Sequence, residues 1–208
     1  MSSFHKNVFI NCPFDNDYFP LLKSVLFTVL FLEFEPKIAE TSDSGASRLS
    51  KIKHLIRASK FSVHDLSRVQ VSEEGLPRFN MPFECGIDLG ARLLEMPGMG
   101  DKKCLILETE KFRYQRFISD ISGNDIRAHH DDPKLAMKNV RDWLNINVRQ
   151  RLTRHADIWL VFNEFEFDYE EILNGEGYDP NDINALTFTD VIDMMKDWIK
   201  GWNETKGE

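Results

Sequence analysis

The chain has 208 residues, 42% of them hydrophobic, and carries 26 Lys and Arg against 34 Asp and Glu, a net charge of −8. This composition is that of a globular chain with enough apolar residues for a proper core, and its negative charge argues against nucleic acid as the main partner. The charge is concentrated: residues 150–208 hold 5 basic and 14 acidic side chains, whereas residues 1–149 hold 21 and 20. We expect an α/β domain over 1–149 and an acidic, mainly helical extension over 150–208 packed on it.

Cysteine usage and the N-terminal segment bear on the compartment. Cys12, Cys85 and Cys104 are an odd number without CxxC spacing, which is typical of a reducing compartment and argues against a disulfide framework. The first ten residues lack the features of a signal peptide, and the longest apolar run, 25–32, is too short to span a bilayer. We therefore expect a cytoplasmic protein that does not enter the membrane.

Short apolar runs alternate with stretches of helical periodicity in the first half of the chain. The predicted strands cover 7–11, 36–40, 61–66 and 103–108, and the predicted helices between them cover 18–34, 48–60 and 82–95. Strands that alternate with helices of this length indicate a parallel sheet covered on both faces, with ligands at the carboxyl ends of its strands.

The second half of the chain is predicted to be mainly helical. We expect a short helix over 111–120, a short edge strand or loop over 125–129, and helices over 133–149, 150–162 and 185–202. The acidic stretch 163–182 shows little apolar periodicity, so we expect no regular element there.

Polar residues follow the predicted strand ends, where an open parallel sheet brings them together. Asn11 and Cys12 follow the first strand, Asp65 lies at the end of the third, and Asn80 and Glu84 lie at the start of the next helix. In the first helical turn Glu84 would be held ionised by the helix dipole, and could act as a nucleophile or stabilise a developing cation. The alternative is an ordinary acidic residue at a helix start.

Three segments, VFINCPF at 8–14, SVHDLS at 62–67 and NMPFECGIDLG at 80–90, resemble in order and spacing the nucleoside 2-deoxyribosyltransferase-like group. That group shares a flavodoxin-like sheet with TIR domains, and the resemblance covers about residues 7–108. It implies that Pro13 and Phe14 form the floor of a site, that Asp65 holds ribose hydroxyls, and that Glu84 attacks or stabilises the anomeric carbon.

The activity implied by the resemblance is cleavage of an N-glycosidic bond, whose oxocarbenium-like transition state gains from a nearby carboxylate. NAD is the favoured substrate, as in hydrolases of the NADase type that act in antiphage or stress defence, with no cofactor and with a homo-oligomeric assembly. Asn80 and Asp65 would bind hydroxyls, and Arg48 and Arg78 would bind phosphates unless they are ordinary surface residues. Two alternatives stay open: a true deoxyribosyltransferase, and a non-catalytic nucleotide sensor or scaffold.

Other candidate residues are better explained by structure. Residues 129–132 have the sequence His-His-Asp-Asp, but adjacent residues do not converge easily on one ion and Pro133 indicates a helix start, so we expect no metal site. His64 and Asp65 alternate along a strand and should point to opposite faces. Cys12 and Cys85 are best explained as buried packing residues.

Overall fold

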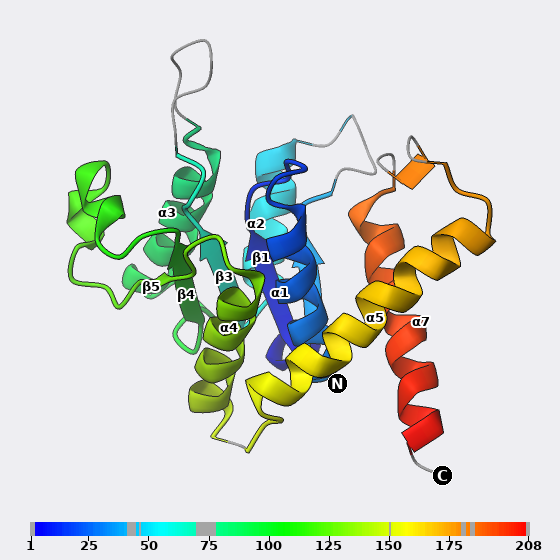
Figure 1. The fold of residues 1–208 in the computed structure, drawn as a ribbon. Helices are drawn as coiled ribbons and strands as arrows, with labels where there is room; N and C mark the ends of the chain where they lie inside the picture. Colours follow the sequence, from blue (N-terminus) through cyan, green and yellow to red (C-terminus); the bar gives the residue numbers. More distant parts are fainter. Residues whose placement is uncertain are drawn as a thin grey trace.

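A five-stranded, all-parallel sheet forms the centre of the computed structural model (Figure 1), which describes residues 3–40, 45, 47–69, 78–149, 151–179, 182–183 and 186–206. The order β2-β1-β3-β4-β5 is the flavodoxin-like order, which confirms the expected fold class. The strands are β1 (Asn7–Asn11), β2 (Glu35–Ile38), β3 (Phe61–Asp65), β4 (Lys103–Glu108) and β5 (Arg127–Ala128). Val8 pairs with Phe61, and Phe61 with Lys103, so the three central strands begin side by side and end at a common edge.

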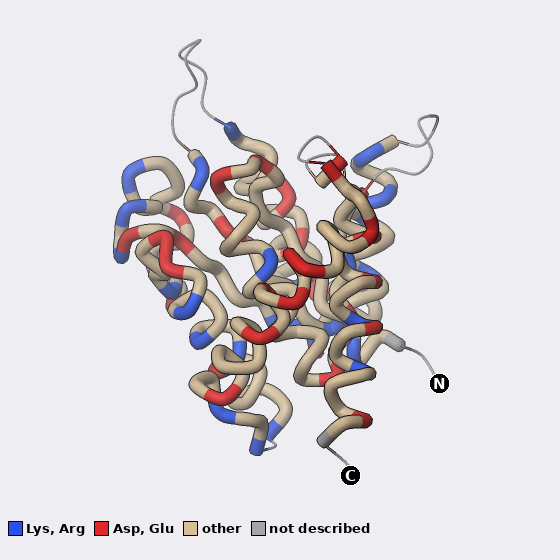
Figure 2. The backbone as a smooth tube through the Cα atoms, turned by 45° about the vertical axis from the view of Figure 1, so that its right-hand side comes forward, with Lys and Arg blue, Asp and Glu red and all other residues tan. Residues whose placement is uncertain are grey.

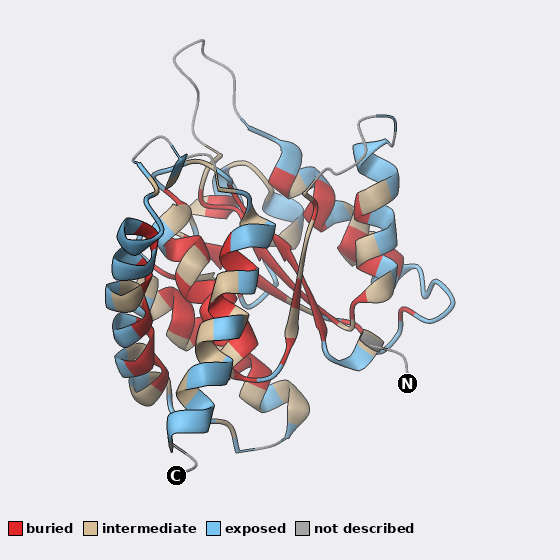
Figure 3. Ribbon diagram, turned by 90° about the vertical axis from the view of Figure 1, so that its right-hand side faces the viewer, coloured by how far each residue is buried: buried red, intermediate tan, exposed pale blue. Residues whose placement is uncertain are grey.

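Helices cover both faces of the sheet. The helices α1 (Phe19–Phe31) and α4 (Pro133–Val148) pack together on one face, where the largest apolar cluster lies, and α2 (Arg48–Ala58) and α3 (Asn80–Leu93) contact each other and β1 on the other. Figure 3 shows buried strands between helices whose outer faces are exposed. Short 3-10 helices at Ser3–His5, Arg113–Arg116 and Ser119–Ile121 complete this part, the last two in place of the single helix predicted over 111–120.

Helix starts follow from local side-chain chemistry. The Asp15 carboxylate accepts the Tyr18 backbone N–H at 3.0 Å, and Pro20 occupies the first turn of α1. Asp132 caps α4 by accepting the backbone N–H groups of Lys134 and Leu135 at 2.8 and 3.3 Å. Asp132 therefore satisfies amides that α4 itself leaves free, whereas Asp15 fixes the turn that leads into α1.

The C-terminal part differs from the prediction. The helix α5 runs over His155–Gly175, so the expected end at 162 and the absence of a regular element after it are wrong. The buried residues of α5 recur every three or four positions: they are Ile158, Val161, Phe162, Phe165, Tyr169 and Leu173. The acidic residues between them are exposed or half-buried. The helix α7 (Phe188–Lys206) replaces the one predicted from Ala185, a residue outside the described part of the chain.

The helices α5 and α7 share the main apolar cluster with α1 and α4. Phe27 of α1 lies 5.3 and 5.4 Å from Phe162 and Phe165 of α5 and 6.1 Å from Trp198 of α7, measured between ring centroids. The helices α5 and α7 of the acidic extension thus pack on the helices of the sheet, while the division of the chain into two parts at residue 150 stays a prediction. Figure 2 shows acidic residues recurring along these helices. Among the described residues, no helix has the length and apolar character needed to cross a bilayer.

Candidate active site

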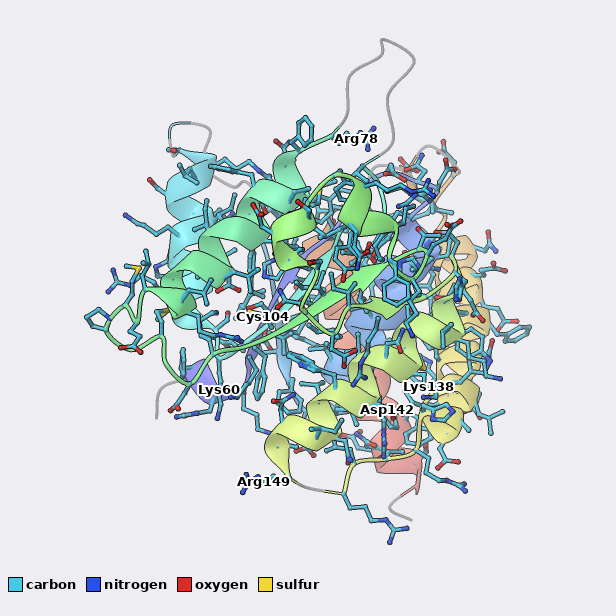
Figure 4. All side chains as sticks on the ribbon, turned by 90° about the vertical axis from the view of Figure 1, so that its left-hand side faces the viewer. Lys60, Arg78, Cys104, Lys138, Asp142 and Arg149 are labelled. Atoms are coloured by element: carbon cyan, nitrogen blue, oxygen red, sulfur yellow. The ribbon has the colours of Figure 1, made fainter. Side chains whose placement is uncertain are left out.

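A cavity of about 480 Å³ lies beyond the carboxyl end of β1, between the starts of α2 and α3. Eight of the nine residues proposed from the sequence line it, together with Asp15 and Met81, which sequence reasoning missed: Asn11, Cys12, Pro13, Phe14, Arg48, Arg78, Asn80 and Glu84. Figure 4 labels Arg78 at this end of the molecule, with Lys60 at the opposite end and Cys104 between them. The polar residues that follow β1 and begin α3 therefore do converge on one cavity.

Two larger cavities, of about 690 and 560 Å³, lie elsewhere. The carboxylates that line them are exposed or half-buried. In the cavity beyond β1, by contrast, Glu84 is a buried carboxylate with a guanidinium beside it. A buried, charge-paired carboxylate in a cleft is the more usual mark of a reactive site.

Glu84 is the most informative residue of this cavity. It is the fifth residue of α3, so the expected position in the first helical turn is wrong, because the helix begins at Asn80 rather than Pro82. Burial raises the pKa of the Glu84 carboxyl above its ordinary value, and the Arg48 guanidinium, whose Nη2 lies 3.4 Å from Oε1, opposes that shift. A cationic neighbour, more than the helix terminus, therefore favours the ionised form of this carboxylate.

The segment after β1 forms one wall of the cavity. Cys12 is almost fully buried, and burial together with the negative charges of Asp65, Glu84 and Asp15 raises the pKa of its thiol well above the ordinary value. A raised pKa favours the protonated thiol, which is the less nucleophilic form. Phe14 is partly exposed, and its ring lies 4.9 Å from that of Phe188, the first residue of α7.

Two arginines stand at the rim with their side chains about half exposed. Arg48 also donates from Nη1 to the Ala39 carbonyl at 3.3 Å, and Arg78 donates to the Asp15 carboxylate at 3.2 Å. Guanidinium groups in this position suit an anionic ligand such as a phosphate.

Asp65, the ninth proposed residue, is absent from the lining. It is fully buried on the other face of the sheet, where Oδ2 accepts from the Tyr18 hydroxyl at 2.6 Å and lies 3.0 Å from His129 Nε2, and Oδ1 accepts the Ser67 N–H at 2.8 Å. Burial alone would raise the pKa of Asp65, but these donors hold it below the ordinary value. Both carboxylate oxygens are engaged and the side chain is fully buried outside the cavity lining, so Asp65 does not face a ligand bound there.

The opposite face of β3 carries a second buried group that sequence reasoning missed. His64 Nε2 lies 3.0 Å from Asp88 of α3, whose other oxygen lies 3.2 Å from the ammonium of the fully buried Lys102. One signal was present in the sequence: Glu84 and Asp88 are one helical turn apart and share the buried face of α3.

Among the residues that the structure describes, His64, Asp88 and Cys104 form a group that could hold a metal ion, since their ligand atoms lie within 4.8 Å of one another. Two features oppose a cation there. Lys102 already supplies the positive charge beside Asp88, and burial raises the pKa of the Cys104 thiol to about 12, so that it is protonated. We therefore assign this cluster a structural role.

Comparison with known proteins finds no matching family model, no similar curated protein and no similar solved structure.

Proposed function

We propose that the protein cleaves the N-glycosidic bond of a nucleotide, with NAD as the favoured substrate and Glu84 as the catalytic carboxylate. The observation that carries this proposal is the buried Glu84 carboxylate, paired with Arg48, in a cavity at the carboxyl end of a parallel sheet. A carboxylate so placed stabilises the positive charge that develops on the anomeric carbon as the base departs.

In the hydrolytic form of the reaction, the bond between the anomeric carbon and the base nitrogen breaks and the base leaves with the electron pair. A water oxygen then bonds to the anomeric carbon and releases its proton to solvent. In a transferase, the Glu84 carboxylate itself would bond to the anomeric carbon, and a second base would displace it. Arg48 and Arg78 at the rim suit the phosphates of a nucleotide, which favours a nucleotide over a free nucleoside.

The direct test is incubation of the purified chain with NAD, followed by chromatographic detection of nicotinamide and ADP-ribose. Glu84→Gln keeps the shape of the side chain but removes the negative charge, and we expect it to lose at least a hundredfold in rate, the scale of a preorganised electrostatic contact. Glu95→Gln, at an exposed glutamate just after α3, is the matched control and should keep the wild-type rate. Equal rates for wild type and Glu84→Gln would remove Glu84 from the mechanism.

Two alternatives follow from the same cavity. A deoxyribosyltransferase would exchange bases between deoxynucleosides, which the same chromatographic assay detects. A non-catalytic nucleotide sensor is favoured by one observation, the engagement of Asp65 by Tyr18, Ser67 and His129, because Asp65 is then not available to hold the ribose hydroxyls as the resemblance implies. Binding of ADP-ribose without turnover of NAD or deoxynucleosides would support the sensor.

The wider biology is proposed on the resemblance alone. A NADase of this kind would deplete NAD as an antiphage or stress effector inside the cell, and it would act as a homo-oligomer. We expect a second copy to make contact at the exposed apolar side chains of α3 and of the residues that flank it, namely Phe79, Phe83, Leu93 and Leu94. Light scattering of the wild type and of Phe83→Lys tests this, since loss of the apolar contact should lower the molecular mass of the particle.

A further inference from the structure

The orientation of the Asn11 side chain is determined by a backbone carbonyl. Its Nδ2 lies 3.0 Å from the Met81 carbonyl oxygen and 2.9 Å from His64 Nδ1. A carbonyl oxygen only accepts hydrogen bonds, so the Asn11 atom beside it must be the amide nitrogen. Both hydrogens of that nitrogen are then used, one on Met81 and one on His64.

The donation from Asn11 fixes the histidine as well. His64 Nδ1 accepts, so in the neutral ring the proton is on Nε2, which lies 3.0 Å from Asp88 Oδ2. Asp88 stays ionised because, although burial opposes its charge, His64, Lys102 and Ser62 hold its pKa at about 2. Lys102 is in turn fixed by the carbonyl oxygens of Ile56 and Ser59, at 2.8 and 2.7 Å. This chain of buried bonds leaves Asn11 one orientation.

The orientation of Asn11 determines which of its atoms faces the cavity that it lines. With Nδ2 engaged, Oδ1 is the remaining polar atom of the side chain, and no donor among the described residues bonds to it. Glu84, also in the lining, likewise presents carboxylate oxygens. The buried oxygen atoms that Asn11 and Glu84 bring to the lining are therefore hydrogen-bond acceptors, while the guanidinium donors of Arg48 and Arg78 stand at the rim.

We propose that Asn11 is the residue that selects a ribose over a deoxyribose in this cavity, accepting a sugar hydroxyl through Oδ1, with His64 as the positioning residue that keeps this oxygen in place. The proposal rests on the proposed function and narrows its substrate to a phosphorylated ribose derivative: hydroxyl donors face Asn11 and Glu84, and the phosphate faces the arginines. A site built to bond a hydroxyl discriminates against the analogue that lacks it, because its own polar atom is then left without a partner.

The test is calorimetric titration of the wild-type chain with ribose 5-phosphate and with 2-deoxyribose 5-phosphate. We expect the ribose compound to bind about tenfold more tightly, the worth of one hydrogen bond of this kind. Asn11→Leu, similar in volume but without Oδ1, should bring the two affinities to within about twofold. Asn7→Leu is the matched control: Asn7 is buried on the same strand and donates to the Ala58 carbonyl at 2.8 Å, but it lies at the other end of β1.

His64→Phe keeps a ring in the core but removes the acceptor that holds Asn11, and it should reduce the sugar preference while phosphate binding persists. A stability role alone would lower the melting temperature and leave the preference intact. If Asn11→Leu fails to fold, the sugar preferences of the wild type and of His64→Phe still test the proposal. Three results would overturn the proposal: the wild type binds the two sugar phosphates equally, it binds neither, or Asn11→Leu keeps the wild-type preference.

Failure of the proposed function gives a different pattern. A tenfold ribose preference that Asn11→Leu abolishes, in a chain that does not cleave NAD, supports the selection by Asn11 and contradicts the glycosidase. Cleavage of NAD that depends on Glu84, in a chain without sugar preference, supports the glycosidase and contradicts the role of Asn11.

Discussion

Arg48 Nη2 lies 3.4 Å from Glu84 Oε1, across the gap between the first turn of α2 and the second turn of α3. The carboxylate is buried, whereas the arginine side chain is half exposed at the rim. Burial raises the pKa of Glu84 and the arginine lowers it, so the balance of the two effects determines the pH at which Glu84 ionises.

The first prediction concerns the pH dependence of Glu84. Since burial raises its pKa, activity that needs the ionised form should rise with pH through that pKa, above the range of an ordinary glutamate. Arg48→Gln removes the charge that favours the ionised form, so the pKa should rise further and the profile should move to higher pH. Carboxyl NMR titration of ¹³C-labelled glutamates measures this without any substrate, with Glu84→Gln assigning the signal.

Arg78→Gln is the control for that titration, because the Arg78 guanidinium pairs with Asp15 rather than with Glu84. It should leave the Glu84 pKa close to its wild-type value. An unchanged titration in Arg48→Gln would mean that the contact between Arg48 and Glu84 does not influence the site.

The second prediction concerns the buried ion pair between Lys102 and Asp88. Lys102→Met leaves the Asp88 carboxylate without its ammonium partner in the interior, which should lower the free energy of unfolding at pH 7 by about 3 kcal/mol. The folded-state pKa of Asp88, about 2, lies below the ordinary value of 3.8, so its contribution is present above pH 4 and is lost as pH falls towards 2. The stability difference between variant and wild type should therefore shrink over that pH window.

Urea unfolding at pH 7 and at pH 3 measures both parts of this prediction. Lys103→Met, at the exposed neighbouring position, is the control and should change stability by less than about 0.5 kcal/mol. A Lys102→Met chain as stable as wild type at pH 7 would contradict the ionic description of this cluster.

The third prediction concerns the packing of α5 on α1. Phe165→Ala removes a fully buried ring that lies 5.4 Å from Phe27, and it should destabilise the chain by about 3–5 kcal/mol. Phe167→Ala, two residues further along the same helix but 65% exposed, should stay within about 0.5 kcal/mol of wild type. Thermal unfolding of the two variants distinguishes a core shared by α1 and α5 from an extension that folds separately. In the second case, Phe165→Ala would leave the main unfolding transition unchanged.

Several elements could be predicted from the sequence because their signal is local. The strand β4 was predicted with its observed bounds, since one nearly continuous apolar run ends in charged residues at both sides. The convergence of the residues after β1 with those that begin α3 follows from parallel strands ending at one edge. The second half of α5, beyond residue 162, was not predicted because aromatic and acidic residues alternate closely along it, which obscures the spacing of its buried positions.

Asp65 shows what a positional argument leaves out. The end of β3 lies at the same edge of the sheet as the cavity, but successive side chains of a strand alternate between the two faces. Because the His64 side chain points towards α3, the Asp65 side chain points towards α1. Glu84 belongs to α3, so a residue of β3 that lies beside Glu84 must be on the same face of the sheet as His64. The alternation of His64 and Asp65 along the strand therefore already indicated that Asp65 and Glu84 lie on opposite faces. The pairing of Asp88 with Lys102 had no such signal, because it depends on how α3 packs over the segment before β4.

The last prediction links the C-terminal helix to the cavity. The Glu40 carboxylate caps α7 by accepting the backbone N–H groups of Phe188 and Thr189 at 3.0 and 3.1 Å, and Phe188 in turn packs against Phe14 in the cavity wall. Phe188→Ala removes the support of Phe14, and we expect ribose 5-phosphate to bind about three- to tenfold more weakly, the range of one aromatic pair.

Trp202→Ala is the matched control, because Trp202 is an aromatic residue at the far end of α7, where it packs against Phe31. It should lower the melting temperature and leave the affinity for ribose 5-phosphate unchanged, whereas Phe188→Ala should change the affinity. Calorimetric titration and thermal unfolding of both variants separate the two effects. If Phe188→Ala binds the sugar phosphate as tightly as wild type, α7 stabilises the fold without shaping the cavity.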